Sequence, residues 1–305
     1  MLRRIFISIT PIILCTFIFN LNTALNQTIY TKILIYIKDY QEQLVASQYG
    51  IFAGEAVVIV NIPIALSSAI SVSILPSISG TYSLGNRKAT NHKIDAGIRT
   101  TMLISIPAAV GLTVLSRPIV QILFPQKDTL IQAAELLCLL SFTVIFYSLS
   151  TVTNAVLQGI NKVRLPVINA LIALIAQTIV LVIILLFTDW NIFALTTAAI
   201  VYSLLMCVLN GLSIWKCLRY RLSVRSNILI PLTASCIMGG IARLLYICFY
   251  VLCKSNTISV LLAIIVAIPL YGIIVIRLGG INEHELNVLP KGKTIVELGK
   301  RLKLF

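Results

Sequence analysis

The sequence has very few charged residues for its length. Only 11% of its 305 residues are Asp, Glu, Lys or Arg, whereas 58% are hydrophobic and the mean hydropathy is +0.99. A soluble domain usually carries about 25% charged residues, and a water-soluble fold of this length could not cover its surface with so few. The composition therefore excludes an ordinary soluble protein and predicts an all-α membrane protein.

Motifs that carry enzyme chemistry are also missing. The sequence contains no H-E-x-x-H, no G-x-S-x-G and no phosphate-binding glycine loop, and its apolar segments contain no Asp or His. Its seven cysteines form no C-x-x-C pair, so neither a zinc site nor a disulfide framework is indicated. We therefore expect no catalytic residue, no cofactor and no bound metal.

Eight apolar segments can be marked along the chain, and each reaches the ~20 residues that a helix needs to cross the hydrocarbon core. They are residues 5–30, 50–75, 100–123, 131–157, 165–187, 191–215, 228–252 and 257–278. The first segment leaves a signal peptide open as an alternative, because Arg3 and Arg4 precede a short apolar stretch. No convincing cleavage site follows, which favours a membrane crossing.

Positive charge is distributed unevenly between the connections. With eight crossings, alternate connections lie on the same side of the membrane. Of the 24 Lys and Arg residues, five lie on one side and Arg243 lies within a crossing, which leaves 18 on the side that holds both termini. The positive-inside rule makes that side cytoplasmic. The basic run at residues 87–93 is then a cytoplasmic connection, and the net charge of +14 requires no nucleic acid as a partner.

Two charged residues inside the crossings are candidates for a substrate path. A charge at the centre of a membrane helix costs about 2.5–3.5 kcal/mol, so Glu55 and Arg243 each need a partner or a wet cavity. Arg243 could contact an anionic substrate group or a lipid phosphate, or pair with a carboxylate or a helix C-terminus. Glu55 could line a central cavity, reach the interface or pair with a basic residue. Gly239 and Gly240, just before Arg243, would allow another helix to approach closely.

Amides and prolines inside the crossings also favour a substrate path through the membrane. Asn61, Asn154 and Gln158 are further candidates for the substrate path, although each amide could instead hold neighbouring helices together. That alternative applies equally to Asn169, Gln177 and Asn210. Prolines within five crossings predict kinks, which suit a transporter that rocks around a cavity. These prolines are Pro11, Pro63, Pro107, Pro231 and Pro269.

A series of short motifs resembles a known family. Pro63 is followed by "LPSIS" at 75–79, a basic loop, "IPAAVGL" at 106–112, "RPIVQILFP" at 117–125 and "NAVLQGINKVRLP" at 154–166. In order and spacing these are similar to the C-terminal half of the polysaccharide and lipid flippases, in the superfamily that also holds the MATE-type multidrug exporters. The likeness is to stage V sporulation protein B and the Gram-positive MurJ-type lipid II flippases in particular.

The resemblance implies fourteen helices in a whole family member, arranged as two six-helix lobes and a final pair. Eight crossings from a cytoplasmic start match helices seven to fourteen. We therefore expect a six-helix lobe over residues 1–220, a two-helix hairpin over 221–280 and a cytoplasmic basic tail over 281–305. The tail could form a short amphipathic helix at residues 293–305.

The implied substrate is a lipid-linked oligosaccharide, such as the lipid II-like peptidoglycan precursor, moved across the cell (plasma) membrane by alternating access. A MATE-type drug or cation antiporter and a non-transporting membrane subunit or remnant remain alternatives. The arginines with which relatives hold the substrate pyrophosphate lie mainly in the N-terminal lobe. A separate N-terminal lobe is therefore an expected partner, beside the substrate and the lipid bilayer.

Some relatives also bind a cation in the C-terminal lobe, and the resemblance places a carboxylate on the first helix of that site. This chain has no carboxylate there, so such a site would bind a cation weakly or not at all. The polar residues on the corresponding three helices are Asn20, Asn22, Asn169, Gln177, Thr196 and Thr197.

Overall fold

The computed structural model describes residues 2–126 and 128–280, and nearly all of them are helical. The long helices are α1 (Leu2–Lys32), α3 (Val57–Ser83), α4 (Arg87–Val114), α6 (Leu130–Gly159), α7 (Arg164–Phe187), α8 (Ile192–Leu218), α9 (Ile230–Cys253) and α10 (Asn256–Arg277). Two helices are short, α2 (Glu42–Gly50) and α5 (Ser116–Leu123). Three π-helical segments, η1 (Ile33–Ile37), η2 (Ile51–Ala56) and η3 (Arg225–Leu229), adjoin longer helices. The expected tail at 281–305 lies outside the described residues.

Seven of the eight expected membrane crossings are confirmed. Within the described residues, seven helices are long and apolar enough to cross a membrane, with α2, η2 and α3 counted as one continuous helix, Glu42–Ser83. The remaining expected crossing corresponds to α1, a 31-residue helix about 46 Å long at 1.5 Å per residue. The protein is therefore an all-α membrane protein.

The predicted bounds of the third crossing were wrong. Instead of residues 100–123, the helix spans Arg87–Val114, and the basic run forms its first turns. It starts early because Gly85 turns the chain at a φ of 71° and the Asn86 side chain accepts a hydrogen bond from the Ala89 amide at 3.0 Å. It ends early because Pro118 has no N–H to donate to the Val114 carbonyl. The connection before it is therefore much shorter than the loop expected at 76–99.

Four of the five prolines lie inside described crossings. Pro63, Pro107 and Pro269 are inside α3, α4 and α10. Pro231 closely follows η3, inside the continuous helix Arg225–Cys253, and the kinks at these prolines stay a prediction. The side chain of Pro11 lies outside the described residues.

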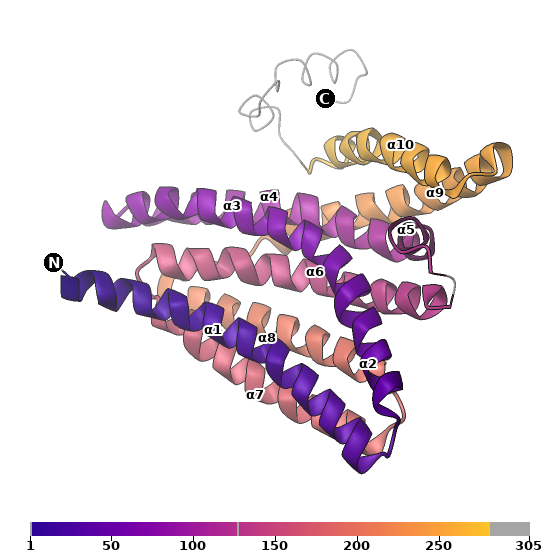
Figure 1. Cartoon of the computed structure of the whole chain (residues 1–305). Helices are drawn as coiled ribbons and strands as arrows, with labels where there is room; N and C mark the ends of the chain where they lie inside the picture. The colour runs from indigo at the N-terminus through magenta and orange to yellow at the C-terminus, as the bar shows by residue number, and fades with distance from the viewer. Residues whose placement is uncertain (1, 127, 281–305) are drawn as a thin grey trace.

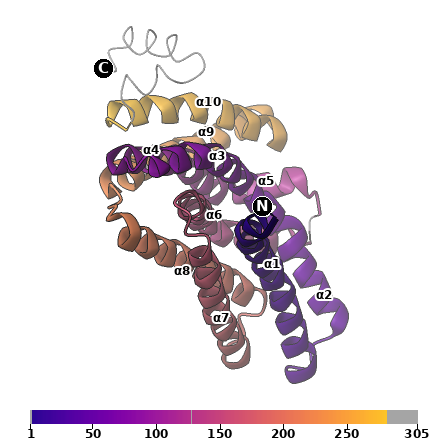
Figure 2. The same cartoon turned by 90° about the vertical axis from the view of Figure 1, so that its left-hand side faces the viewer.

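The lobe is built around α6. This helix packs against α3, α4, α5 and α8, and most of its apolar stretch is buried, unlike that of the other crossings. In Figures 1 and 2, α3 and α4 run together over one side of α6, whereas α1, α7 and α8 form a second group that diverges from them. The helix α2 rises from the end of α1 to the start of α3 and links the two groups.

The helices α9 and α10 pack against each other on the outside of the lobe, where α9 covers α4 (Figure 2). Gly239 makes this contact close. A Cβ atom added at Gly239 would lie 2.7 Å from Val110 Cγ1, whereas one added at Gly240 would meet no atom within 4 Å. The predicted close approach is therefore confirmed at Gly239 and was wrong for Gly240.

Candidate functional site

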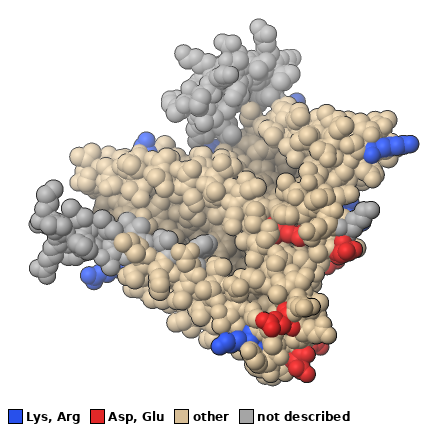
Figure 3. Space-filling model, in the orientation of Figure 1, with Lys and Arg blue, Asp and Glu red and all other residues tan. Residues whose placement is uncertain are grey.

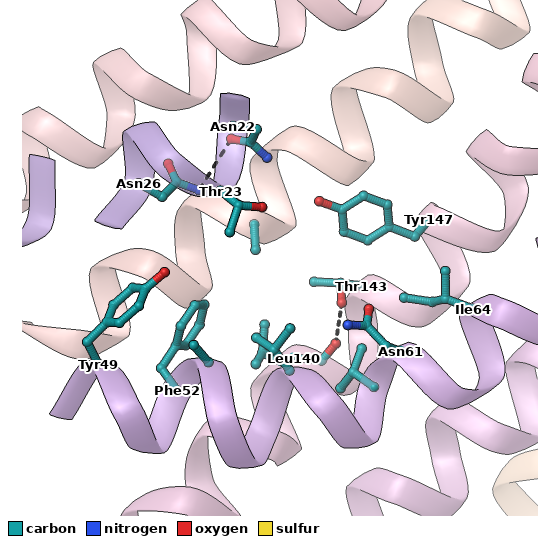
Figure 4. Close-up of a pocket in the computed structure, with 14 residues that line it drawn as sticks. Asn22, Thr23, Asn26, Tyr49, Phe52, Asn61, Ile64, Leu140, Thr143 and Tyr147 are labelled. Carbon is teal, nitrogen blue, oxygen red and sulfur yellow. Dashed lines mark hydrogen bonds between the residues drawn. The ribbon is translucent and has the colours of Figure 1, made fainter. Parts of the chain in front are cut away.

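A mostly apolar cavity of about 230 Å³, with a few polar side chains in its wall, lies between α1, α3 and α6 (Figure 4). Three amides line it, Asn22, Asn26 and Asn61, and its hydroxyl groups come from Thr23, Tyr49, Thr143 and Tyr147. The rest of its wall is apolar, with Phe52 and Leu140 among the larger side chains. Among the described residues, no charged side chain lines it. We call this cavity the lobe pocket.

Helical spacing brings these polar side chains to one place. Asn22 and Asn26 are four residues apart and so share a face of α1, and Asn26 donates a hydrogen bond to Asn22 at 3.3 Å. Thr143 and Tyr147 have the same spacing on α6. The Thr143 hydroxyl donates a hydrogen bond to the Leu140 carbonyl at 2.6 Å. Asn61 is exposed, and its side chain has no hydrogen-bond partner among the described residues. It is the pocket amide most available to a ligand.

Gln177 on α7 holds Asn22 and Asn26, the two α1 amides, in place through hydrogen bonds. It is fully buried in α7, and its amino group donates to both Asn22 Oδ1 and Asn26 Oδ1, the latter at 2.9 Å. The Gln177 amide N–H groups therefore already bind the two oxygens, Asn22 Oδ1 and Asn26 Oδ1, that would have to coordinate a cation. The described residues also contain no group of three His, Cys, Asp or Glu side chains that could hold a metal. The residues present here do not fit the cation site that the family resemblance implied.

A second amide network joins α6, α7 and α8 away from the lobe pocket. Asn210 is fully buried; it donates to Asn154 Oδ1 at 2.8 Å and accepts from Asn169 Nδ2 at 2.8 Å. Asn169 also donates to Ser213 Oγ, and Asn210 to Thr153 Oγ1. Asn154 thus belongs to a network that holds three helices together, as the alternative reading of the amides predicted.

The structure separates Glu55 and Gln158 from the lobe pocket. Glu55 is 8% exposed in η2, with its carboxyl beside the Thr129 hydroxyl, and its Oε2 has no hydrogen-bond partner among the described residues. Glu55 does not line the lobe pocket, where Phe52 and Val57 form the wall nearby, and a role for Glu55 in a cavity between two lobes stays a prediction. Gln158 lies near the end of α6 and does not line it either. Of the five candidates, the pocket contains Asn61.

Arg243 caps the end of α4. Its guanidinium donates to the Val114 carbonyl at 3.4 Å and lies 5.8 Å from the ring centre of Tyr246. This is the carbonyl that Pro118 leaves without its helical hydrogen bond. A cation at the C-terminus of a helix is also favoured by the helix dipole. The helix C-terminus was one of the partners considered for Arg243.

Sequence reasoning missed a polar cluster that ties the α8–α9 connection to α4. Asp95 Oδ1 accepts hydrogen bonds from Tyr220 Oη at 2.8 Å and from Asn227 Nδ2 at 2.9 Å. Burial, together with the Asp95 carboxylate, raises the pKa of Tyr220. Nearby, Arg99 donates to the Gly280 carbonyl after α10. Asp95 was overlooked because the start of α4 had been read as a loop.

These features define a class of protein, a multi-pass helical membrane protein whose lobe holds an uncharged, mostly apolar pocket and carries an outer helix pair. The family model described as "Lipid II flippase MurJ" matches residues 5–273, so the chain belongs to the MurJ family of lipid II flippases. This family membership decides against the MATE-type alternative. A flippase family is one of transporters.

Individual relatives agree with this family. The chain is 27% identical over 256 residues to the lipid II flippase MurJ of Bacillus subtilis (strain 168), covering 81% of this chain and 44% of that protein. It is 26% identical over 152 residues to a probable lipid II flippase MurJ of Aquifex aeolicus (strain VF5), covering 48% and 30%. The chain thus spans less than half the length of these relatives.

A solved structure shows the same fold. The inward closed conformation of lipid II flippase MurJ superposes with a TM-score of 0.67 at 18% identity, over 85% of this chain and 51% of that one. The likeness extends over most of the helices described above.

Proposed function

We propose that this chain forms one half of a flippase that moves a lipid-linked oligosaccharide, such as the lipid II-like peptidoglycan precursor, across the plasma membrane by alternating access. Residues 1–220 would form the lobe, residues 221–280 the outer helix pair and residues 281–305 a basic tail. The reaction involves no covalent chemistry. The protein binds the polar head group in a cavity while the lipid tail stays in the bilayer.

The observation that carries this proposal is the chemistry of the lobe pocket. Amide and hydroxyl groups are the usual hydrogen-bond partners of uncharged sugar hydroxyls, and an apolar wall with a few polar groups is typical of ligand cavities. A pyrophosphate, however, needs cations, and no charged side chain from the described part of the chain lines the pocket. The counter-charge must come from outside it, which supports a second, facing lobe as a partner. That lobe could belong to the same polypeptide or to a separate one.

Charge placement supports an orientation with both termini in the cytoplasm. Basic residues cluster at the end of the lobe that contains Arg87, Lys162 and Lys216, whereas exposed acids at the opposite end include Asp39 and Glu42. Figure 3 shows acidic side chains gathered near the end where α2 lies, and a wide uncharged surface between the two ends. A single cysteine at Asn86, in a background without the native cysteines, should resist an impermeant thiol reagent in intact cells and react after lysis. Labelling before lysis would reverse the orientation.

Complementation tests the transport function. A strain depleted of its own lipid II flippase should not grow on this chain alone, but should grow when the N-terminal lobe of the Bacillus subtilis relative is supplied with it. In the rescued pair, Asn61→Leu with Tyr147→Phe should slow growth and lower lipid II translocation, while membrane levels stay unchanged. Ile62→Ala is the control, because Ile62 adjoins Asn61 and is 59% exposed but does not line the pocket.

Two results would overturn the proposal. Rescue by the monomeric chain alone would remove the need for a facing lobe. Full translocation by the Asn61→Leu/Tyr147→Phe pair would show that the lobe pocket does not hold the head group.

A further inference from the structure

The outer helix pair meets the lobe at a corner built by α4, α5, α9 and α10. Tyr246 on α9 donates a hydrogen bond to Asn256 Oδ1 on α10 at 2.9 Å, and Asn256 Nδ2 donates to the Pro118 carbonyl on α5 at 3.0 Å. Arg243 lies over the Tyr246 ring. Arg117 is the second guanidinium that acts electrostatically on the Tyr246 phenol. The corner therefore brings together two arginines from separate helices.

Neither arginine has a carboxylate partner among the described residues, where Lys38–Asp189 is the one ion pair. Both side chains are exposed. Arg243 uses one donor for the Val114 carbonyl, at the long distance of 3.4 Å, and a guanidinium has five N–H donors. Two neighbouring guanidinium groups repel each other, so a counter-charge from the surroundings would stabilise them.

The corner lies beside the short helix α5, whose direction differs from that of the long helices. In Figure 1, α5 is seen end-on and so lies across the direction of the long helices. It buries Pro118 and Val120 but exposes Arg117 and Gln121, which is the pattern of a helix lying in the membrane interface. Beyond Arg243, α9 continues for ten residues to Cys253, or about 15 Å. The two arginines thus stand where the lobe ends and the hairpin continues.

We propose that Arg117 and Arg243 form a binding site for the phosphate of a membrane lipid head group. A guanidinium matches a phosphate with two parallel hydrogen bonds, and the Tyr246–Asn256–Pro118 contacts hold the helices that carry the two arginines in register. An anionic phospholipid and a lipid-linked pyrophosphate share this chemistry. The site lies outside the lobe pocket and does not depend on the transport proposal.

Native mass spectrometry of the purified chain in detergent tests the site. Phosphatidylglycerol should bind more tightly than phosphatidylcholine of the same acyl chains. The Arg117→Ala/Arg243→Ala double variant should lose at least about tenfold of the phosphatidylglycerol affinity, since two charge-assisted contacts are removed. Lys32→Ala is the matched control. It removes one exposed positive charge at the same end of the lobe, away from the corner, and should change the affinity by less than about twofold.

Further variants and ligands separate the outcomes. Arg243→Ala also removes the cap of α4, so Arg117→Ala provides a measurement that leaves the cap in place and should by itself weaken binding. Arg243→Lys keeps the charge without the planar guanidinium, so its lipid affinity should lie between those of the wild type and Arg243→Ala.

Undecaprenyl pyrophosphate and inorganic phosphate are added as competitors. Arginine-dependent binding of undecaprenyl pyrophosphate alone would keep the phosphate site and identify the substrate as its ligand. Displacement of phosphatidylglycerol by millimolar inorganic phosphate would support the site and show that free phosphate is sufficient to occupy it. Equal lipid affinities of the folded double variant and the wild type would overturn it.

Discussion

Gly239 and Gly240 offer a controlled test of how the outer helix pair is attached to the lobe. Both glycines lie inside α9, so replacing either by alanine should gain up to about 1 kcal/mol from helix propensity. They differ in surroundings. At position 239 the new Cβ atom would lie 2.7 Å from Val110 Cγ1 and 3.3 Å from Val114 Cγ2, whereas at position 240 it would meet nothing within 4 Å.

The clash at position 239 cannot be relieved by a small rotation of a long side chain, because valine is branched at Cβ and stiff about χ1. The helices α4 and α9 must separate instead, and overpacking of this kind typically costs about 1–3 kcal/mol. Both variants have the same gain in helix propensity, so the difference between their unfolding free energies does not contain it. We therefore expect Gly239→Ala to be less stable than Gly240→Ala by about 1–3 kcal/mol.

Reversible unfolding in detergent micelles would measure this difference. Val110→Ala removes the clashing methyl group, so Gly239→Ala should cost less in that background than in the wild type. If Gly239→Ala and Gly240→Ala have the same unfolding free energy, the close approach of α9 to α4 is wrong. A cost that Val110→Ala does not reduce would place the clash elsewhere.

Two further predictions concern polar contacts at opposite ends of the lobe. Lys38 donates to the Thr188 carbonyl at 2.6 Å and pairs with Asp189 at 2.9 Å, but the Asp189 side chain is 91% exposed. Asp189→Ala should therefore change unfolding by less than about 0.5 kcal/mol, and Lys38→Ala by more, because it also frees the carbonyl. Tyr220→Phe removes a hydrogen bond to the Asp95 carboxylate and should cost about 1.5 kcal/mol. Tyr82→Phe, whose hydroxyl makes no hydrogen bond to a described residue, is its control, and equal costs for the two would contradict the Asp95 contact.

Apolar length was enough to predict the crossings, because a helix must bury its backbone polar groups throughout the bilayer. Boundaries depend on single residues, and there the prediction failed. Nothing in the apolar pattern marks Asn86 as a cap, and Pro118 looks like one more proline in a hydrophobic run. The consequences of that proline are tertiary, since the Val114 carbonyl it leaves free is bound by Arg243, which is far away in sequence.

The pocket was harder to predict than the crossings. The rarity of a charge in a membrane helix makes Glu55 a candidate, but Glu55 lies beside Thr129 and does not line the lobe pocket. Six of the seven polar pocket residues are ordinary amides and hydroxyls that were not selected, and only their helical spacing hints at a common face: Asn22 with Asn26, and Thr143 with Tyr147. Charged residues are rare in membrane helices, so the sequence alone marks them as groups that need partners. A binding surface for a neutral sugar is made of common amide and hydroxyl residues, which the sequence does not mark.

Asn210 shows how much of the lobe's stability rests on such common residues. It bridges Asn154 on α6 and Asn169 on α7, each at 2.8 Å, and is fully buried on α8. Interhelical hydrogen bonds in membranes are worth about 0.6 kcal/mol on average and up to about 1.7. Asn210→Ala removes these two and the longer one to Thr153 Oγ1 and leaves a small void, so we expect a loss of about 1–3 kcal/mol in the unfolding free energy.

Asn61→Ala is the matched control for Asn210, because Asn61 is an exposed amide that makes no hydrogen bond to a described residue. Its loss should leave unfolding nearly unchanged. A double-mutant cycle between Asn210→Ala and Asn169→Ala should give a coupling of about 0.6–1.7 kcal/mol. A coupling near zero, or equal costs for Asn210→Ala and Asn61→Ala, would mean that the network does not hold α6, α7 and α8 together. The lobe would then rest on apolar packing alone, and the buried amides would need another explanation.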